Sequence, residues 1–353
     1  SSASLQPGYT TSDGLITQGE YTGVKGVLRN DVFQRHAKLY SFGWNNKWEG
    51  DDGWNAMFDA SYSKTDRNEL TIESYSGTGR DGQGATDTIG FNSSASGTSF
   101  THGLDYGDYN LMMLTSPQGW GGTQIGTDGT TIVGGQDGYY NNRIVKDELW
   151  QFRVEVSKNF DKGPFSSIQA GWNYTNQSKS LVPEEYFLGL AANTDGTTSV
   201  PVPDEYRLGT TNLKYLGLGP VISYNPIDLI NDGIYNLVPN PYGDVVVKSY
   251  SIREQIMTFY TQANIDTDIG AAHLTGNIGL QANLTDQNSK GATAVYLGQN
   301  ANGSPNIGSL PRNATTNYLD VLPSLNLSLR FPSDFVIRFA AARETIRPRL
   351  DDM

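Results

Sequence analysis

The stretch KLYSFGWNNKW (residues 38–48) alternates large apolar and polar or small side chains with a period of two. Tyr40, Phe42 and Trp44 fall on one side of an extended chain, and the residues between them fall on the other. After the turn residues GDDG (50–53), the alternation resumes in WNAMFDASYS (54–63). The sequence therefore predicts a long β-hairpin with one aromatic face and one polar face.

The same pattern recurs downstream, and short turns join the two halves of each pair. The further segments are ELWQFRVEVSKNF (148–160) with SIQAGWNYTNQ (167–177), SIREQIMTFYTQANI (251–265) with HLTGNIGLQANLT (273–285), and YLDVLPSLNLSLRF (318–331) with FVIRFAAARETI (335–346). Helical periodicity is hard to find. We therefore expect an all-β, antiparallel fold with about eight convincing strands.

The segments between these hairpins are much longer than the turns within them. Residues of about 66–146, 180–248 and 287–317 are rich in Gly, Asn, Asp, Thr and Tyr. Long loops of this kind are uncommon in compact domains, whereas transmembrane β-barrels combine short turns at one end with long extracellular loops at the other. The mean hydropathy of −0.45 suits such a barrel, because its strands alternate apolar and polar residues. These features predict a transmembrane β-barrel domain with three long extracellular loops.

The amino-acid composition argues against several classes of function. There are 25 Lys and Arg against 37 Asp and Glu, a net charge of −12, so binding to a nucleic-acid backbone is not expected. Cysteine is absent and only three His occur, which argues against a zinc site or thiol catalysis. We expect no metal and no cofactor.

A soluble, secreted β-rich carbohydrate-binding module is the alternative from another class. Its strands would also alternate, but they average about 5 or 6 residues, whereas these run to about 10 or more. A two-sheet core would also need apolar residues, where the second face here carries Arg, Gln, Asn and Glu. Burial of Phe42, Trp44, Phe152 and Trp172 against a second sheet would favour this alternative.

The C-terminal third carries an ordered set of motifs. Glu254 precedes a GNIG hairpin (276–279), then a D-x-LPS-x-N strand from Asp320 to Asn326, then a T-x-RP element at Thr345–Pro348. In order and spacing, this set resembles TonB-dependent outer-membrane receptors, and most of all the group found in Caulobacter-like and Xanthomonas-like bacteria. For residues 1 to about 180 the resemblance rests on general barrel patterning.

The resemblance implies active uptake across the Gram-negative outer membrane. In such a transporter the inner-membrane TonB complex acts on a plug domain, and outer-membrane lipid surrounds a barrel of roughly 22 strands. The sequence shows neither a plug with its coupling box nor a terminal aromatic strand. We therefore expect residues 1–353 to form a partial β-barrel domain, with the plug and the C-terminal strands absent.

An enzymatic function is not expected. Acidic pairs such as Glu184-Glu185 and Asp204-Glu205 could in principle serve a glycosidase, but each lies among Gly, Pro and Asn in an expected turn or loop. The sequence contains no G-x-S-x-G nucleophile elbow, and its Gly-rich runs lack the lysine of a phosphate-binding loop.

The long loops are the best candidates for ligand binding, because flat aromatic faces beside Asp and Asn suit sugars. The predicted substrate-binding residues are Asp105, Trp120, Asp137, Tyr139, Tyr140, Asn141, Tyr186 and Tyr206. An oligosaccharide such as a maltodextrin is the preferred substrate class. A ferric siderophore, which more often attracts Arg and Lys, is the alternative within the family.

Overall fold

The computed structural model describes residues 3–120, 124–125, 131–132, 136–240, 243–299 and 305–350. Strands hold 69% of these described residues and helices 6%, so the expected all-β class is confirmed. Within the described residues, no helix is both long and apolar enough to cross a membrane.

One large antiparallel sheet organises the molecule. Its eight principal strands are β4 (Leu28–Glu49), β5 (Trp54–Gly77), β11 (Gly138–Asn159), β12 (Phe165–Leu190), β17 (Tyr250–Ile269), β18 (Ala272–Gln299), β19 (Pro305–Arg330) and β20 (Val336–Ala342). They are neighbours in this same order. In the part of the chain that the structure describes, β4 and β20 do not pair with each other and the sheet does not close.

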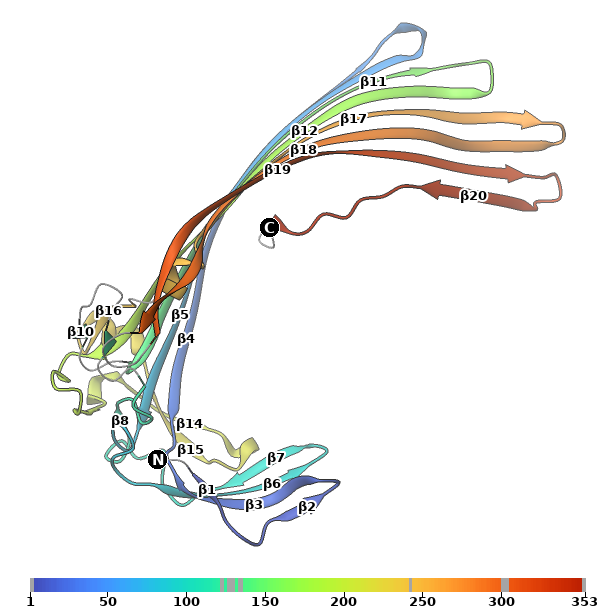
Figure 1. Ribbon diagram of the computed structural model, residues 1–353. Helices are drawn as coiled ribbons and strands as arrows, with labels where there is room; N and C mark the ends of the chain where they lie inside the picture. Colours follow the sequence, from blue (N-terminus) through green and yellow to red (C-terminus); the bar gives the residue numbers. More distant parts are fainter. Residues whose placement is uncertain are drawn as a thin grey trace.

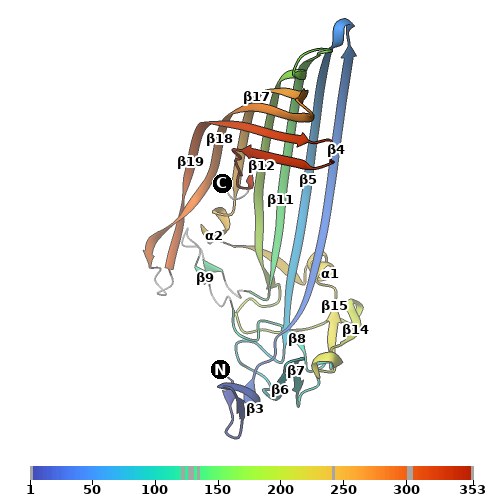
Figure 2. The ribbon, with the colours of Figure 1, turned by 90° about the vertical axis from the view of Figure 1, so that its right-hand side faces the viewer.

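The sheet is strongly curved, and its two ends differ (Figure 1). One end carries only short connections: the 3-10 turn η1 (Asp51–Gly53) and residues 160–164, 270–271 and 331–335. The opposite end, which we call the outer end, carries the long segments 78–137 and 191–249. Figure 2 shows the long strands running side by side, with the irregular segments gathered below them. The expected asymmetry of short turns and long loops is therefore present.

Pairing brings the alternating residues of these strands into register. One row crosses seven strands as Trp44, Ala60, Phe152, Tyr174, Met257, Leu284 and Leu319. The adjacent row, which points to the other side, is Asn45, Asp59, Arg153, Asn173, Thr258, Asn283 and Asp320. We call these sides the apolar face and the polar face. The hollow of the curve is on the polar side, where the C-terminal segment lies and Arg347 Nη2 donates to Thr285 Oγ1 at 3.4 Å.

The strands extend into segments that were expected to be loops. Residues 66–77, 138–146 and 180–190 are strand, and so are most of 287–317. At about 3.3 Å per residue, the 24 residues of β5 span roughly 80 Å, whereas about 10 tilted residues cross a bilayer. The outer halves of these strands carry polar residues on both faces, so their sequence shows no clear alternation of apolar and polar residues. They form strands because neighbouring strands satisfy their backbone hydrogen-bonding groups.

The outer end also carries many short elements. It contains β1 (Ser4–Leu5), β2 (Thr10–Ser12), β3 (Leu15–Val24), β6 (Asp87–Ser94), β7 (Gly97–Thr101), β8 (Met113–Leu114), β9 (Gln124–Ile125), β10 (Thr131–Ile132), β13 (Val200–Pro201), η2 (Asp204–Tyr206), β14 (Arg207–Asn212), η3 (Lys214–Leu216), β15 (Pro220–Tyr224), α1 (Pro226–Asn231), β16 (Tyr235–Pro239) and α2 (Gly243–Val246). Ile72 and Leu188 of the large sheet are buried with Met112, Leu229 and Tyr235 from these segments. This core fixes the loops against the strands that carry the candidate site.

Candidate functional site

Three strands bring chemically distinctive side chains together at the outer end of the polar face. Tyr139 on β11 pairs with Glu73 on β5 and with Phe187 on β12, and Asn141 pairs with Glu185. Because alternate residues of a strand share a face, these odd-numbered side chains point to the same side. We define the outer cluster as Glu73, Tyr75, Trp120, Gln136, Tyr139, Asn141, Glu185 and Lys248.

The first half of the outer cluster is centred on Tyr75. Its hydroxyl donates to Glu73 Oε2 at 2.9 Å and accepts from Gln136 Nε2 at 3.2 Å. The Trp120 ring meets the Tyr75 ring edge to face, with centroids 5.3 Å apart. Burial, reinforced by Glu73, raises the pKa of Tyr75 to about 12. The phenol therefore remains a neutral hydrogen-bonding group at physiological pH.

The second half is centred on Tyr139. Its hydroxyl donates to Glu185 Oε2 and accepts from Asn240 Nδ2 at 3.1 Å. Lys248 Nζ donates to both oxygens of Glu185, at 2.7 and 2.8 Å. Beside this pair, the Asn141 side-chain oxygen is buried and has no hydrogen-bond partner among the described residues.

Each carboxylate of the outer cluster faces a cation. Glu73 faces Arg29, whose Nη2 lies 2.8 Å from Glu73 Oε1 and also 2.8 Å from Asp31. Glu185 faces Lys248. Each of these two cations is therefore already paired with a carboxylate. Tyr75 and Glu185 are only 3% and 5% exposed, whereas the Trp120 ring is 45% exposed and open to a ligand.

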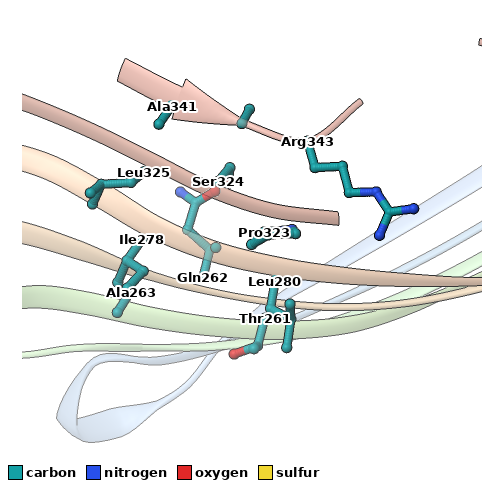
Figure 3. Close-up of a pocket in the computed structure, with 12 residues that line it drawn as sticks. Thr261, Gln262, Ala263, Ile278, Leu280, Pro323, Ser324, Leu325, Ala341 and Arg343 are labelled. Carbon is teal, nitrogen blue, oxygen red and sulfur yellow. The ribbon is translucent and has the colours of Figure 1, made fainter. Parts of the chain in front are cut away.

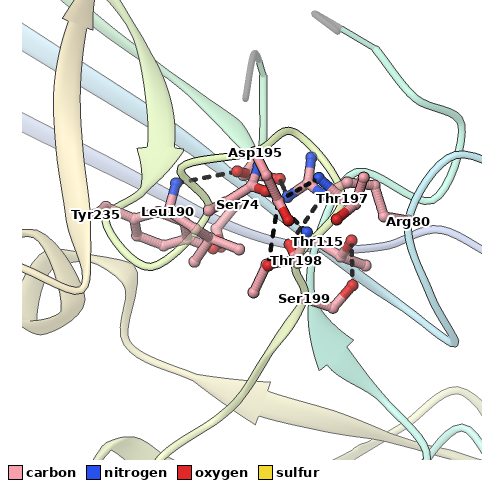
Figure 4. A network of polar contacts seen from close by, with 11 residues as sticks. Ser74, Arg80, Thr115, Leu190, Asp195, Thr197, Thr198, Ser199 and Tyr235 are labelled. Carbon is pink, nitrogen blue, oxygen red and sulfur yellow. Dashed lines mark hydrogen bonds and ion pairs between the residues drawn. The ribbon is translucent and has the colours of Figure 1, made fainter. Parts of the chain in front are cut away.

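Asp137 lies in the same region, but its side chain holds other parts of the chain together. Its side chain is fully buried, forms an ion pair with Arg80, and accepts from the Leu190 amide at 3.0 Å. Arg80 also donates to the Thr198 carbonyl at 2.9 Å. Figure 4 shows how this network joins loop segments that are distant in sequence. In this conformation Asp137 contacts other parts of the chain and is inaccessible to a ligand.

The remaining predicted residues lie outside the outer cluster. Tyr140 and Tyr186 form a cross-strand pair with ring centroids 5.8 Å apart, on the other side of the sheet from Tyr139. Tyr206 donates to Asp232 at 3.0 Å. Asp105 is exposed and accepts from the Gly107 amide at 2.9 Å. The structure thus brings together Trp120, Tyr139 and Asn141, but not the other five.

Sequence reasoning missed Glu73, Tyr75, Glu185 and Lys248 as members of the site. Glu185 was expected in a turn or loop, but β12 continues through it. The available signal was the continued spacing of two residues between Glu73 and Tyr75, and between Tyr139 and Asn141. Only the pairing of β5, β11 and β12 shows that these residues converge.

Nearer the turns, the polar face carries a second network. Arg153 donates from Nε to the Tyr260 hydroxyl at 3.0 Å and from Nη2 to Glu155 at 2.6 Å. A hollow of about 640 Å³ adjoins Tyr260, Gln281 and Asn283. The polar face therefore remains lined with hydrogen-bonding groups well below the outer cluster.

A separate hollow of about 580 Å³ lies against the apolar face of β17–β20 (Figure 3). It is lined mainly by aliphatic side chains, such as Ile278, Leu280, Pro323 and Leu325. No group of His, Cys, Asp and Glu suited to holding a metal ion occurs among the described residues.

Comparison with known protein families, with curated proteins and with solved structures finds no match. Function is therefore inferred from the sequence and the geometry of the chain itself.

Proposed function

We propose that this chain forms part of the wall and the outer loops of a TonB-dependent transporter in a Gram-negative outer membrane. The observation that carries the proposal is the uncovered apolar face. Phe42 and Trp44 remain 70% and 57% exposed, and Trp44 belongs to the row of mainly apolar residues that crosses seven strands. Lipid is the environment in which such a face is favourable.

The two ends of the sheet support an orientation in which the long loops lie outside the cell. Short turns are typical of the periplasmic end of outer-membrane barrels, and long loops of the extracellular end. In this orientation the outer cluster faces the medium, and the polar face lines the path inward. The chain then supplies wall and binding groups, while the energy comes through a plug domain moved by the TonB complex.

A neutral oligosaccharide, such as a maltodextrin, is the proposed substrate class. Aromatic rings beside amide and carboxylate groups bind the C–H faces and hydroxyls of sugars. Trp120, Tyr139 and Asn141 supply these groups in the outer cluster. A ferric siderophore is less well matched, because Arg29 and Lys248 are both engaged by carboxylates.

The test is calorimetric titration of the full chain, purified in detergent, with maltoheptaose and separately with a ferric catecholate siderophore. We expect heat of binding from the sugar and none from the iron complex. Binding of the iron complex alone would refute the sugar assignment. A chain that stays monomeric in water without detergent would refute the outer-membrane assignment and favour the soluble carbohydrate-binding module.

A further inference from the structure

A row of cations and serines crosses four strands on the apolar side of the sheet, nearer the long loops than Met257 and Leu284 are. Lys146 pairs with Ser180, Ser180 with Ser251, and Ser251 with Lys290. These residues therefore share one face, at a spacing of about 4.8 Å per strand. Arg253 lies two residues from Ser251 on the same face. We call this set the basic row.

The positive charges of the basic row are not neutralised by ion pairs within the described residues. Lys146, Arg253 and Lys290 are all exposed, and none forms an ion pair within the described residues. Arg253 makes one hydrogen bond, from Nε to Asn176 Oδ1 at 3.2 Å. Lys64, in contrast, is already paired with Asp66 at 3.3 Å. In a chain with a net charge of −12, three such cations around two hydroxyls form a locally positive site.

The surface beside the row is hollowed. A depression of about 400 Å³ is lined by Ser180, Ser251 and Lys290, and its apolar wall includes Val182, Val246 and Pro311. Three carboxylates lie nearby on the same face. Asp66 is the cross-strand neighbour of Lys146 on β5 and is paired with Lys64, whereas the other two lie closer to the apolar residues. Of these two, Glu148 accepts from Trp150 Nε1 at 3.0 Å, and Asp286 is exposed. The depression thus combines a cation and hydroxyls with an apolar wall.

The position of the basic row along the strands matches a membrane boundary. On β17 the apolar face begins at Met257, six residues from Ser251, and on β18 it begins at Leu284, six residues from Lys290. Six residues correspond to about 20 Å along a strand and less along the membrane normal, because barrel strands are tilted by about 40°. The basic row therefore lies at the depth of lipid headgroups and their sugars.

We propose that the basic row binds the phosphorylated headgroup of an outer-leaflet glycolipid. Ammonium, guanidinium and hydroxyl groups donate charge-assisted hydrogen bonds to phosphate oxygens, and the apolar wall of the depression receives the flat face of a headgroup sugar. This inference rests on the outer-membrane part of the proposed function, and it concerns the opposite side of the sheet from the outer cluster.

The experiment compares the full chain in detergent micelles that contain diphosphorylated lipid A with the same chain in micelles that contain its dephosphorylated form. Co-elution of lipid in gel filtration is the measurement. We expect wild-type protein to retain the phosphorylated lipid, and the variant K146Q/R253Q/K290Q to retain at least fivefold less. The charge-conserving variant K146R/R253K/K290R should retain it as wild type does.

A matched control removes three other charges. R143Q/K214Q/R312Q alters cations on the polar face and in the outer loops, and its lipid retention should equal that of wild type. Equal retention by the two glutamine variants, or full displacement of lipid A by inorganic phosphate, would overturn the inference. A chain that does not enter micelles at all would instead refute the proposed membrane location, and this inference with it.

Discussion

The phenol ring of Tyr260 lies against the backbone of Gly171, its cross-strand partner on the polar face. A Cβ at residue 171 would come within 2.4 Å of both the ring carbon Cζ and the hydroxyl oxygen. In this position Tyr260 donates to Glu155 Oε2 at 2.5 Å and accepts from Arg153. The absence of a side chain at Gly171 thus sets the geometry of the network that lines the polar face near the turns.

Replacing Gly171 by Ala should therefore displace Tyr260 and destabilise the chain by about 1–3 kcal/mol, as overpacking does. Urea unfolding in detergent measures the change. Gly43→Ala is the matched control, because that glycine is also in a strand and a Cβ added there would meet no other atom within 4 Å. Equal stability of the two variants would contradict the role given to Gly171.

The buried pair of Arg80 and Asp137 should be a strong determinant of loop stability. Asp137→Ala leaves the guanidinium buried without its partner, and we expect a loss of about 3–5 kcal/mol in the free energy of unfolding. Arg80→Met combined with Asp137→Leu should recover part of this loss, because no buried charge remains. A double variant as unstable as the single one would show that the pair is not what fixes the loops.

Acid sensitivity should depend on Asp87. Burial alone would raise the pKa of this carboxyl, but hydrogen bonds from the Gly103 amide, the Tyr106 hydroxyl and the amides of Leu104 and Thr88 together lower it. Its contribution to stability is therefore present above the ordinary Asp pKa of about 3.9. It is lost as the pH falls through the lower pKa of the folded state.

Asp87→Asn should therefore reduce the stability difference between about pH 6 and pH 3, measured by thermal unfolding across that range. The exposed residue Asp105 provides the control, since Asp105→Asn removes a carboxylate from the same loop without breaking this network. If both substitutions leave the same pH profile as wild type, Asp87 is not the responsible group.

The outer cluster should bind sugar through its aromatic rings. Trp120→Ala is expected to weaken maltoheptaose binding by roughly 1 kcal/mol or more, about fivefold in Kd, if the ring stacks on the ligand. Tyr215→Ala is the control, because that ring is 78% exposed on η3. Unchanged affinity after Trp120→Ala would assign the indole to packing against Tyr75.

Adjacent residues on opposite faces of β11 test the membrane orientation. Phe152→Lys places a charge on the apolar face and should cost about 2–4 kcal/mol of stability in lipid. Gln151→Lys places the same charge on the polar face, where solvation costs little. Refolding yield in lipid vesicles distinguishes them, and equal yields would argue against lipid contact at Phe152.

Local sequence was sufficient for the all-β class, the hairpin positions and the assignment of apolar and polar faces, because a period of two is a property of each strand alone. It also placed Trp120, Tyr139 and Asn141 among the candidate ligand-binding residues. It did not separate Tyr139 from Tyr140, since both rings look equally suitable until one knows which face each occupies.

Tertiary structure decided what depends on pairing between distant segments. The register of β5, β11 and β12 joined Glu73 to Tyr139 and Glu185, and it aligned Lys146 with Lys290 across two serine-bearing strands. Loop folding buried Asp137 against Arg80 and so removed it from the accessible surface. Alternation fixes the side of a strand on which a residue lies, but only cross-strand hydrogen bonding fixes its neighbours.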